Sequence, residues 1–140
     1  KEEVPEGEYT IPLGKARVVR EGSAVTLLAW GSMLHRTLQA IEDIDAEVID
    51  LMTLKPFDEE TILKSVKKTG RVVIVHEAPK TCGFGAELSA TIAEDAMLYL
   101  KSPIIRVTGY DVVLPLPKLE DYYIPTAARI KKAIEEVMKY

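Results

Sequence analysis

A three-layer α/β/α sandwich around a mostly parallel sheet is the fold class that this sequence predicts, on three observations. Short apolar runs alternate along the chain with helical patterns, as successive strand–helix–strand units require. The runs are apolar at consecutive positions, which indicates strands buried on both faces. The length of 140 residues, 47% of them hydrophobic, suits one domain with a single core.

The first sixteen residues differ in composition from the rest of the chain. Residues 1–16 are charged, carry Pro and Gly, and show little apolar periodicity. This pattern predicts an extended arm or linker from a missing upstream domain, followed by the folded domain at 17–140. Residues 15–20 could add a short edge strand.

Two strand–helix units come next. Residues 24–30 form an apolar strand, and Ser32 is the predicted N-cap of the helix that follows. Residues 47–51 are the next strand. The helix after it is predicted to begin at Asp58, a good N-cap, and to end at Gly70, a typical C-terminal stop.

The most informative stretch of the chain starts at residue 71. Residues 71–75 predict a buried parallel strand, which ends abruptly at His76 and Glu77. In an α/β protein, this strand delivers both ionisable side chains to the carboxyl edge of the sheet, where ligands and partners usually bind.

The rest of the chain completes the alternation. A third helix is predicted from an apolar stripe at Leu88, Ile92, Ala96 and Tyr99. Residues 103–107 are the last strand. A loop rich in Pro, Asp and Tyr then leads to Thr126, where the final helix opens and continues toward Tyr140.

His76 and Glu77 are the obvious candidates for acid–base chemistry, because imidazole titrates near neutral pH and a carboxylate can tune it. Adjacent strand residues point to opposite sides, however, so the two need not share a site. The alternative is a packed, hydrogen-bonded histidine beside a glutamate in an interface salt bridge.

Gly83 and Gly85 could cradle an anion at a helix N-terminus, as in a regulatory domain, or could simply permit a tight turn.

Composition excludes several classes of function. The net charge of −4, without a dense basic stripe, argues against nucleic-acid binding. The sequence has no apolar run long enough to cross a membrane. One cysteine, Cys82, fits a reducing cytoplasm. The chain has no Asn and a single Gln, Gln39, a depletion typical of heat-adapted proteins.

Five runs, in order along nearly the whole chain, resemble the beta subunit of thiamine-diphosphate-dependent 2-oxo acid dehydrogenases of the pyruvate and branched-chain type. They are VPEGEYTIPLGKA (4–16), LMTLKPFD (51–58), VHEAP (75–79), GFGAE (83–87) and RVTG (106–109). The chain is similar to that subunit's carboxyl-terminal, transketolase-type domain. The equivalent domain of another transketolase-type thiamine enzyme is the alternative.

This resemblance implies a mixed five-stranded sheet. The short first strand, near residues 16–20, is expected to lie at one edge and to run antiparallel to the others. The strand near Val48 should follow it across the sheet, then those near Leu27 and Val73, with the strand near Ile105 at the far edge.

The resemblance also implies a role. The family works as an α2β2 assembly of alpha and beta subunits that decarboxylates a 2-oxo acid and transfers the acyl group to lipoamide on an acyltransferase. The family's motif for thiamine diphosphate and magnesium is built from Gly-Asp-Gly and Asn on the alpha subunit, and this sequence has neither. The domain alone is therefore expected to bind no cofactor or metal and to have no catalytic residues.

Contact residues follow from the same resemblance. His76, Glu77 and the loop residues Gly83, Phe84, Gly85 and Glu87 are expected near contacts between subunits. The acyltransferase's subunit-binding domain is expected to dock on the terminal helix, including Tyr140, and on an acidic residue before the last strand. Lys101 stands at that acidic position.

Overall fold

The computed structural model describes residues 6–115 and 118–140, so the first five residues of the predicted arm lie outside the described part. The five strands form one sheet in the order β1-β3-β2-β4-β5. β1 is antiparallel to β3 and all other pairs are parallel, which confirms the predicted order and the antiparallel edge strand. The strands are β1 (Arg17–Arg20), β2 (Val25–Ala29), β3 (Ala46–Asp50), β4 (Val72–Pro79) and β5 (Ile105–Gly109).

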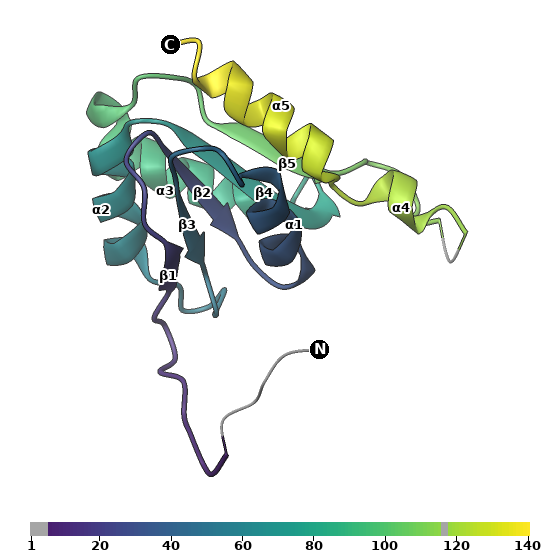
Figure 1. Cartoon of the computed structure of the whole chain (residues 1–140), viewed down its shortest axis with the longest axis horizontal. Helices are drawn as coiled ribbons and strands as arrows, with labels where there is room; N and C mark the ends of the chain where they lie inside the picture. Colours follow the sequence, from purple (N-terminus) through teal and green to yellow (C-terminus); the bar gives the residue numbers. More distant parts are fainter. Residues whose placement is uncertain (1–5, 116–117) are drawn as a thin grey trace.

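Helices cover both faces of this sheet, so the predicted three-layer sandwich is confirmed (Figure 1). α1 and α5 pack together on one face, and α2 and α3 pack together on the other. The helices are α1 (Ser32–Ala40), α2 (Glu59–Thr69), α3 (Gly85–Ala96), α4 (Glu120–Tyr123) and α5 (Ala127–Val137), with a 3-10 turn, η1 (Met97–Tyr99).

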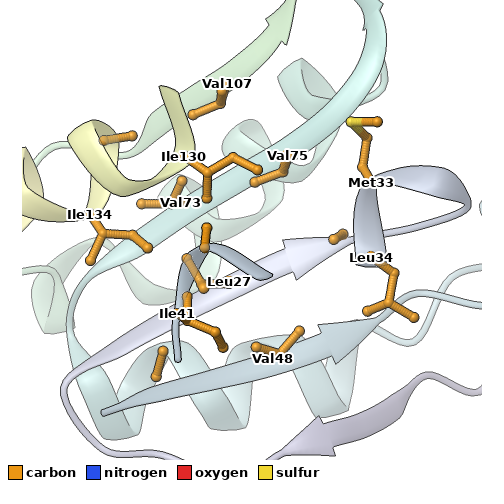
Figure 2. Packing of buried hydrophobic residues seen from close by; sticks show 14 of the residues in the cluster. Leu27, Met33, Leu34, Ile41, Val48, Val73, Val75, Val107, Ile130 and Ile134 are labelled. Atoms are coloured by element: carbon orange, nitrogen blue, oxygen red, sulfur yellow. The ribbon is translucent and has the colours of Figure 1, made fainter. Parts of the chain in front are cut away.

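Two apolar clusters hold the layers together. On one face, Leu27 and Val73 of the central strands lie near Ile130 and Ile134 of α5, and Val48 lies beside Ile41 at the end of α1, as Figure 2 shows. Alternate residues of the same strands point to the opposite face. There, the buried set includes Leu28, Ile49, Ile74, Ile62, Val66, Leu88 and Ile92. Each fully buried aliphatic side chain contributes about 1.5–3 kcal/mol, so both helical layers are anchored by the hydrophobic effect.

Local signals in the sequence set several helix ends. Asp58 Oδ1 accepts a hydrogen bond from the Thr61 amide at 3.2 Å, and Gly70 ends α2 with a left-handed φ of 74°. Thr126 Oγ1 accepts from the Arg129 amide at 3.3 Å at the start of α5. These three predictions are confirmed.

β4 is longer than the sequence predicts. The strand continues through His76 and Glu77 to Pro79 instead of ending at Val75. Its pairing with β5 shifts register between Val75 and Pro79, so β4 has more residues than β5 between these two paired positions. Such an irregularity bends a strand and redirects its side chains, and it falls where His76 and Glu77 leave the sheet.

Two other expectations are wrong. Tyr99 does not continue the buried stripe of α3, because the helix ends at Ala96 and Tyr99 lies in η1 with 53% of its surface exposed. The tyrosine ring lies 5.4 Å from the Lys67 ammonium. The segment predicted to be a loop before the last helix contains the short helix α4.

The described part of the arm extends away from the sandwich (Figure 1). Residues 6–13 are exposed, and the chain first meets the body at Gly14, whose amide donates to Thr53 Oγ1 at 3.0 Å. The Ala16 amide donates to Asp58 Oδ2 at 3.1 Å, and β1 begins at Arg17. The carboxylate that caps α2 therefore also fixes the entry of the chain into the sheet.

Candidate functional site

His76 is enclosed at the carboxyl edge of the sheet. Its side chain has no exposed surface. The ring stacks on Trp30, which follows β2, with 5.3 Å between ring centroids and 15° between planes. Gly83 and Gly85, from the loop that leads into α3, lie against the edge of the same ring. The end of β2 and the loop before α3 therefore close around one imidazole.

The two glycines are needed for space. A Cβ at Gly83 would clash first with the backbone oxygen of Pro79 and would lie 2.6 Å from His76 Cε1, and one at Gly85 would lie 2.5 Å from Nε2, which are closer than real Cβ contacts. The left-handed φ of this loop, 56°, belongs to Cys82 and not to either glycine. The Gly-x-Gly pattern thus serves the packing of His76, which accounts for it without an anion.

The environment of His76 favours a neutral ring. Burial lowers the pKa of His76, and this is the largest effect on it. The backbone of Ala78 raises the pKa by a smaller amount, and the positive charge of Arg106 lowers it further. Within the described residues, neither ring nitrogen has an aligned hydrogen-bond partner. A general acid or base must reach the proton it transfers, and this ring has no exposed nitrogen. The geometry does not favour acid–base chemistry at His76.

Glu77 points to the other side of β4 and is exposed. Its Oε2 accepts a hydrogen bond from Ser32 Oγ at 2.7 Å. The prediction of Ser32 as N-cap is wrong: Gly31 precedes α1, and the Ser32 hydroxyl forms no cap bond. The Ser32–Glu77 bond instead ties the first turn of α1 to β4, so His76 and Glu77 belong to separate environments.

Phe84 extends the aromatic packing around His76. Its ring makes edge contacts with Trp30 at 5.9 Å and with Phe57 at 5.6 Å between centroids. Beside it, an open hollow of about 400 Å³ is lined by Lys55, Phe57, Cys82, Gly83, Phe84, Ala86 and Glu87. Glu87 is exposed at its rim, so the structure brings five predicted residues, His76, Gly83, Phe84, Gly85 and Glu87, close together.

An apolar surface that sequence reasoning missed follows β5. Val113 and Tyr122 are 92% and 77% exposed, whereas Tyr123 is buried. A hollow of about 380 Å³ is lined by Tyr110, Val112, Pro115, Leu119, Tyr122 and Tyr123. The only sequence signal is an apolar run between Tyr110 and Pro115 that fits neither a strand nor a helix. We call residues 110–115 and 118–123 the apolar loop surface, a feature typical of protein contacts.

Lys101 and Tyr140 lie elsewhere. Lys101 precedes β5, where its amide donates to Gly70 O at 2.7 Å and its ammonium reaches Thr69 O at 3.4 Å. Its cation thus caps the carbonyl end of α2, a favourable place for positive charge. Tyr140 follows α5 and is 63% exposed. Neither residue joins the group around His76.

The side chains at the carboxyl edge do not fit a magnesium diphosphate. Magnesium needs several oxygen ligands in one place; Glu77 is exposed but supplies a single carboxylate, whose Oε2 accepts from Ser32, and the aromatic wall around His76 supplies none. In the part of the chain that the structure describes, no group of three or more His, Cys, Asp or Glu side chains could hold a metal ion.

No helix of residues 6–115 and 118–140 is long and apolar enough to span a bilayer.

The layers and strand order define the class of this protein, an α/β/α domain in which an antiparallel edge strand extends a parallel sheet. The model of the family "Transketolase, C-terminal domain" matches residues 14–130. The chain therefore belongs to the transketolase C-terminal domain family, as its sequence runs indicate.

Similar proteins agree with this family. The mitochondrial 2-oxoisovalerate dehydrogenase subunit beta of Dictyostelium discoideum is 50% identical over 99% of this chain and 39% of its own length. The pyruvate dehydrogenase E1 component subunit beta of Acholeplasma laidlawii is 43% identical over 99% of this chain and 44% of its own. A solved split-gene transketolase, an inactive beta4 tetramer, matches with a TM-score of 0.81 and 29% identity over 98% of this chain and 45% of that one. The chain spans about two fifths of the length of these curated relatives.

Proposed function

We propose that this chain is the carboxyl-terminal assembly and docking domain of the beta subunit of a thiamine-diphosphate-dependent 2-oxo acid dehydrogenase. Residues 1–16 are its linker from an upstream domain, and residues 17–140 are the domain. The complete enzyme decarboxylates a 2-oxo acid oxidatively and acylates lipoamide. Family membership and the beta-subunit relatives support this proposal.

One observation carries the assignment to assembly instead of catalysis. The ionisable group at the centre of the carboxyl edge, His76, is closed to solvent, whereas the apolar loop surface beside it is open. An edge that encloses its imidazole and exposes aromatic and aliphatic side chains suits contact with other polypeptides. In our proposal these are the alpha subunit and a second beta subunit of an α2β2 assembly.

The proposal assigns the cofactor to other parts of that assembly. Thiamine diphosphate and magnesium would be held outside this domain, because the side chains around His76 offer no oxygen ligand and Glu77 offers a single carboxylate. Docking of the acyltransferase's subunit-binding domain would use the end of α5 and Tyr140. This docking would not include an ion pair from an acidic residue before β5, because Lys101 occupies that position and its ammonium caps α2.

The test is co-purification of the full-length beta subunit with its alpha subunit, followed by turnover assays on pyruvate and on branched-chain 2-oxo acids. Val113→Lys with Tyr122→Lys should reduce recovery of the alpha subunit and activity at least tenfold, because two charges would enter an apolar contact. Leu98→Lys is the matched control, since Leu98 is 97% exposed but lies in η1, away from the apolar loop surface. Equal recovery of both variants would refute the assembly role of this surface.

Two further expectations belong to the same proposal. The enzyme is cytoplasmic, which fits the single cysteine, and it is heat-adapted, which fits the absence of Asn. Fractionation of the source cells tests the first expectation. Calorimetry tests the second: a midpoint in the ordinary mesophilic range, about 45–65 °C, would contradict it.

A further inference from the structure

A third hollow, a groove, lies at the β5 edge of the sheet, between β5 and α5. Among the described residues, β5 is the last strand in the sheet order and pairs on one side only, with β4. Figure 1 shows α5 running beside it. The groove encloses about 460 Å³ and is lined by Ile105, Arg106, Val107, Arg129, Lys132, Ala133 and Glu136.

The charges in this groove are unbalanced. It holds three cations and one carboxylate, in a chain whose net charge is −4. The carboxylate, Glu136, already bonds Lys139 at 2.5 Å. Among the described residues, Arg106, Arg129 and Lys132 take part in no ion pair. The groove therefore has local positive charge that the described part of the chain does not neutralise.

The two arginines are held in place by neutral partners. Arg129 Nη2 donates to Thr108 O at 2.6 Å, and its guanidinium lies 4.5 Å from the centre of the Tyr110 ring. Arg106 Nη1 donates to Lys80 O at 3.2 Å. Arg129 Nη1 is buried and has no hydrogen-bond partner among the described residues. Both arginine side chains are thus positioned by backbone carbonyls, and the exposed ammonium of Lys132 is the cation of α5 that stays open to a carboxylate.

The outer edge of β5 supplies the second half of a binding site. A strand with one paired side presents a row of backbone N–H and C=O groups on the other side, and extended peptides bind to such rows. The five residues of β5 span roughly 17 Å, enough for a partner segment of five or six residues. Alternate side chains of that segment would face the same side, toward the cations on α5.

We propose that the β5–α5 groove binds an extended polypeptide segment with carboxylates at alternate positions, which adds a strand to the free edge of the sheet. This inference goes beyond the proposed function, which concerns the carboxyl edge. The free backbone row favours a polypeptide over a nucleic acid, because backbone N–H and C=O groups pair with another strand.

Peptide binding to the 140-residue chain tests the proposal by fluorescence anisotropy. The probe is a fluorescein-labelled eight-residue peptide of alternating glutamate and valine. It should bind at least tenfold more tightly than the same peptide with lysine in place of glutamate. A peptide in which proline replaces two of the valines keeps the charge but lacks two backbone donors, and it should bind at least fivefold more weakly than the probe. Equal binding of the glutamate and lysine peptides would overturn the proposal.

Variants locate the site. Lys132→Glu should weaken binding of the glutamate peptide about fivefold to tenfold, since an attraction becomes a repulsion. Lys131→Glu is the matched control: it makes the same charge change on α5, but Lys131 lines a different hollow beside the end of α1. Equal weakening by Lys131→Glu would show a general charge effect and would reject the site.

Amide hydrogen exchange on the unmodified chain gives a readout that does not depend on variants. The peptide should slow exchange at Ile105–Gly109, because a new strand protects the outer edge of β5. Unchanged exchange there would overturn strand addition. Displacement of the peptide by inorganic phosphate at equal concentration would indicate a small-anion site and also overturn it. A dimer of the free chain that the Lys132→Glu variant abolishes would assign the groove to self-association instead.

Discussion

The two ends of the sheet satisfy their polar groups in opposite ways. At the amino end, Thr26 Oγ1 shares hydrogen bonds with Ser65 Oγ at 2.7 Å and Thr69 Oγ1 at 2.8 Å. Buried Glu47 pairs there with Lys68 of α2. At the carboxyl end, His76 is buried without an aligned partner, next to the exposed apolar loop surface.

This difference separates stability from interaction. At the amino end, the buried side chains of Thr26 and Glu47 find partners from α2, and Arg71 Nε is the buried group there that has none among the described residues. The carboxyl end leaves apolar area uncovered and a titratable ring unbonded, features that a partner or a change of pH can act on. Substitutions at the two ends should therefore have different consequences.

The largest loss of stability is expected at the amino end. Lys68→Met leaves the buried Glu47 carboxylate without its cation, which should lower the free energy of unfolding by about 2–3 kcal/mol. This loss of stability lies at or below the low end of the range for breaking a fully buried ion pair. The reason is that the Lys68 side chain is 42% exposed. Lys67→Met is the matched control and should cost about 0.5–1 kcal/mol, the contribution of its contact with Tyr99. Urea denaturation measures both, and equal losses would contradict the distinction.

The same ion pair gives the amino end an acid limit. Burial raises the pKa of Glu47, but the hydrogen bond from Lys68 and other polar contacts outweigh burial and hold the net pKa below 4.5. Because the folded pKa is depressed, this contribution is fully present above about pH 4.5 and is lost as the pH falls through the folded pKa. Urea denaturation of wild type and Glu47→Gln below pH 5 should show a shallower pH slope for the variant.

A clash at the carboxyl end comes next in size. Gly85→Ala would place a methyl group against His76 Nε2, which should cost about 1–3 kcal/mol by overpacking. In a His76→Ala background the same change should cost at least about 1 kcal/mol less, because the obstructing ring is gone. A double-mutant cycle in urea tests this, and additive losses would show that the glycine is needed for another reason.

His76 should make stability depend on pH near neutrality. Burial lowers its folded pKa below 6.5, so the unfolded chain binds the proton first as the pH falls. The contribution of His76 is therefore complete above about pH 6.5 and declines below it, by at most about 1.4 kcal/mol per pH unit. His76→Phe should flatten this slope in urea titrations between pH 7 and 5. A slope unchanged in His76→Phe would contradict the assignment.

The smallest change in stability is expected on the apolar loop surface. Val113→Lys and Tyr122→Lys should each shift the free energy of unfolding by no more than about 0.5 kcal/mol, because both side chains are largely exposed. They should nevertheless reduce self-association, which we expect of the wild-type chain at high concentration. Light scattering over a concentration series measures this, and a wild type that stays monomeric throughout would contradict it.

Sequence reasoning succeeded where the signal was local. Asp58, Gly70 and Thr126 act within one helical turn of their own positions, so their cap roles could be predicted from residue type. Ser32 looked equally suitable, yet its hydroxyl bonds Glu77, a residue 45 positions away. A competing partner from β4 decided that case, and nothing near Ser32 in the sequence signals it.

The candidate site was predicted in part. The sequence placed His76 and the Gly83–Gly85 loop at one edge of the sheet, and the structure brings them into contact. It did not reveal that the glycines serve the imidazole, since that depends on the stacking of Trp30 from another strand. The apolar loop surface was missed because its residues have no strand or helix period.

By itself, the sequence determined the layers, the two-faced burial of the strands and three helix ends, because periodicity and capping depend on neighbours a few positions away. The tertiary structure alone decided which polar groups find partners, which glycines must lack a side chain, and which strand edge stays free beside unneutralised arginines. These outcomes depend on contacts between segments tens of residues apart, and the order of residues along the chain does not encode such contacts locally.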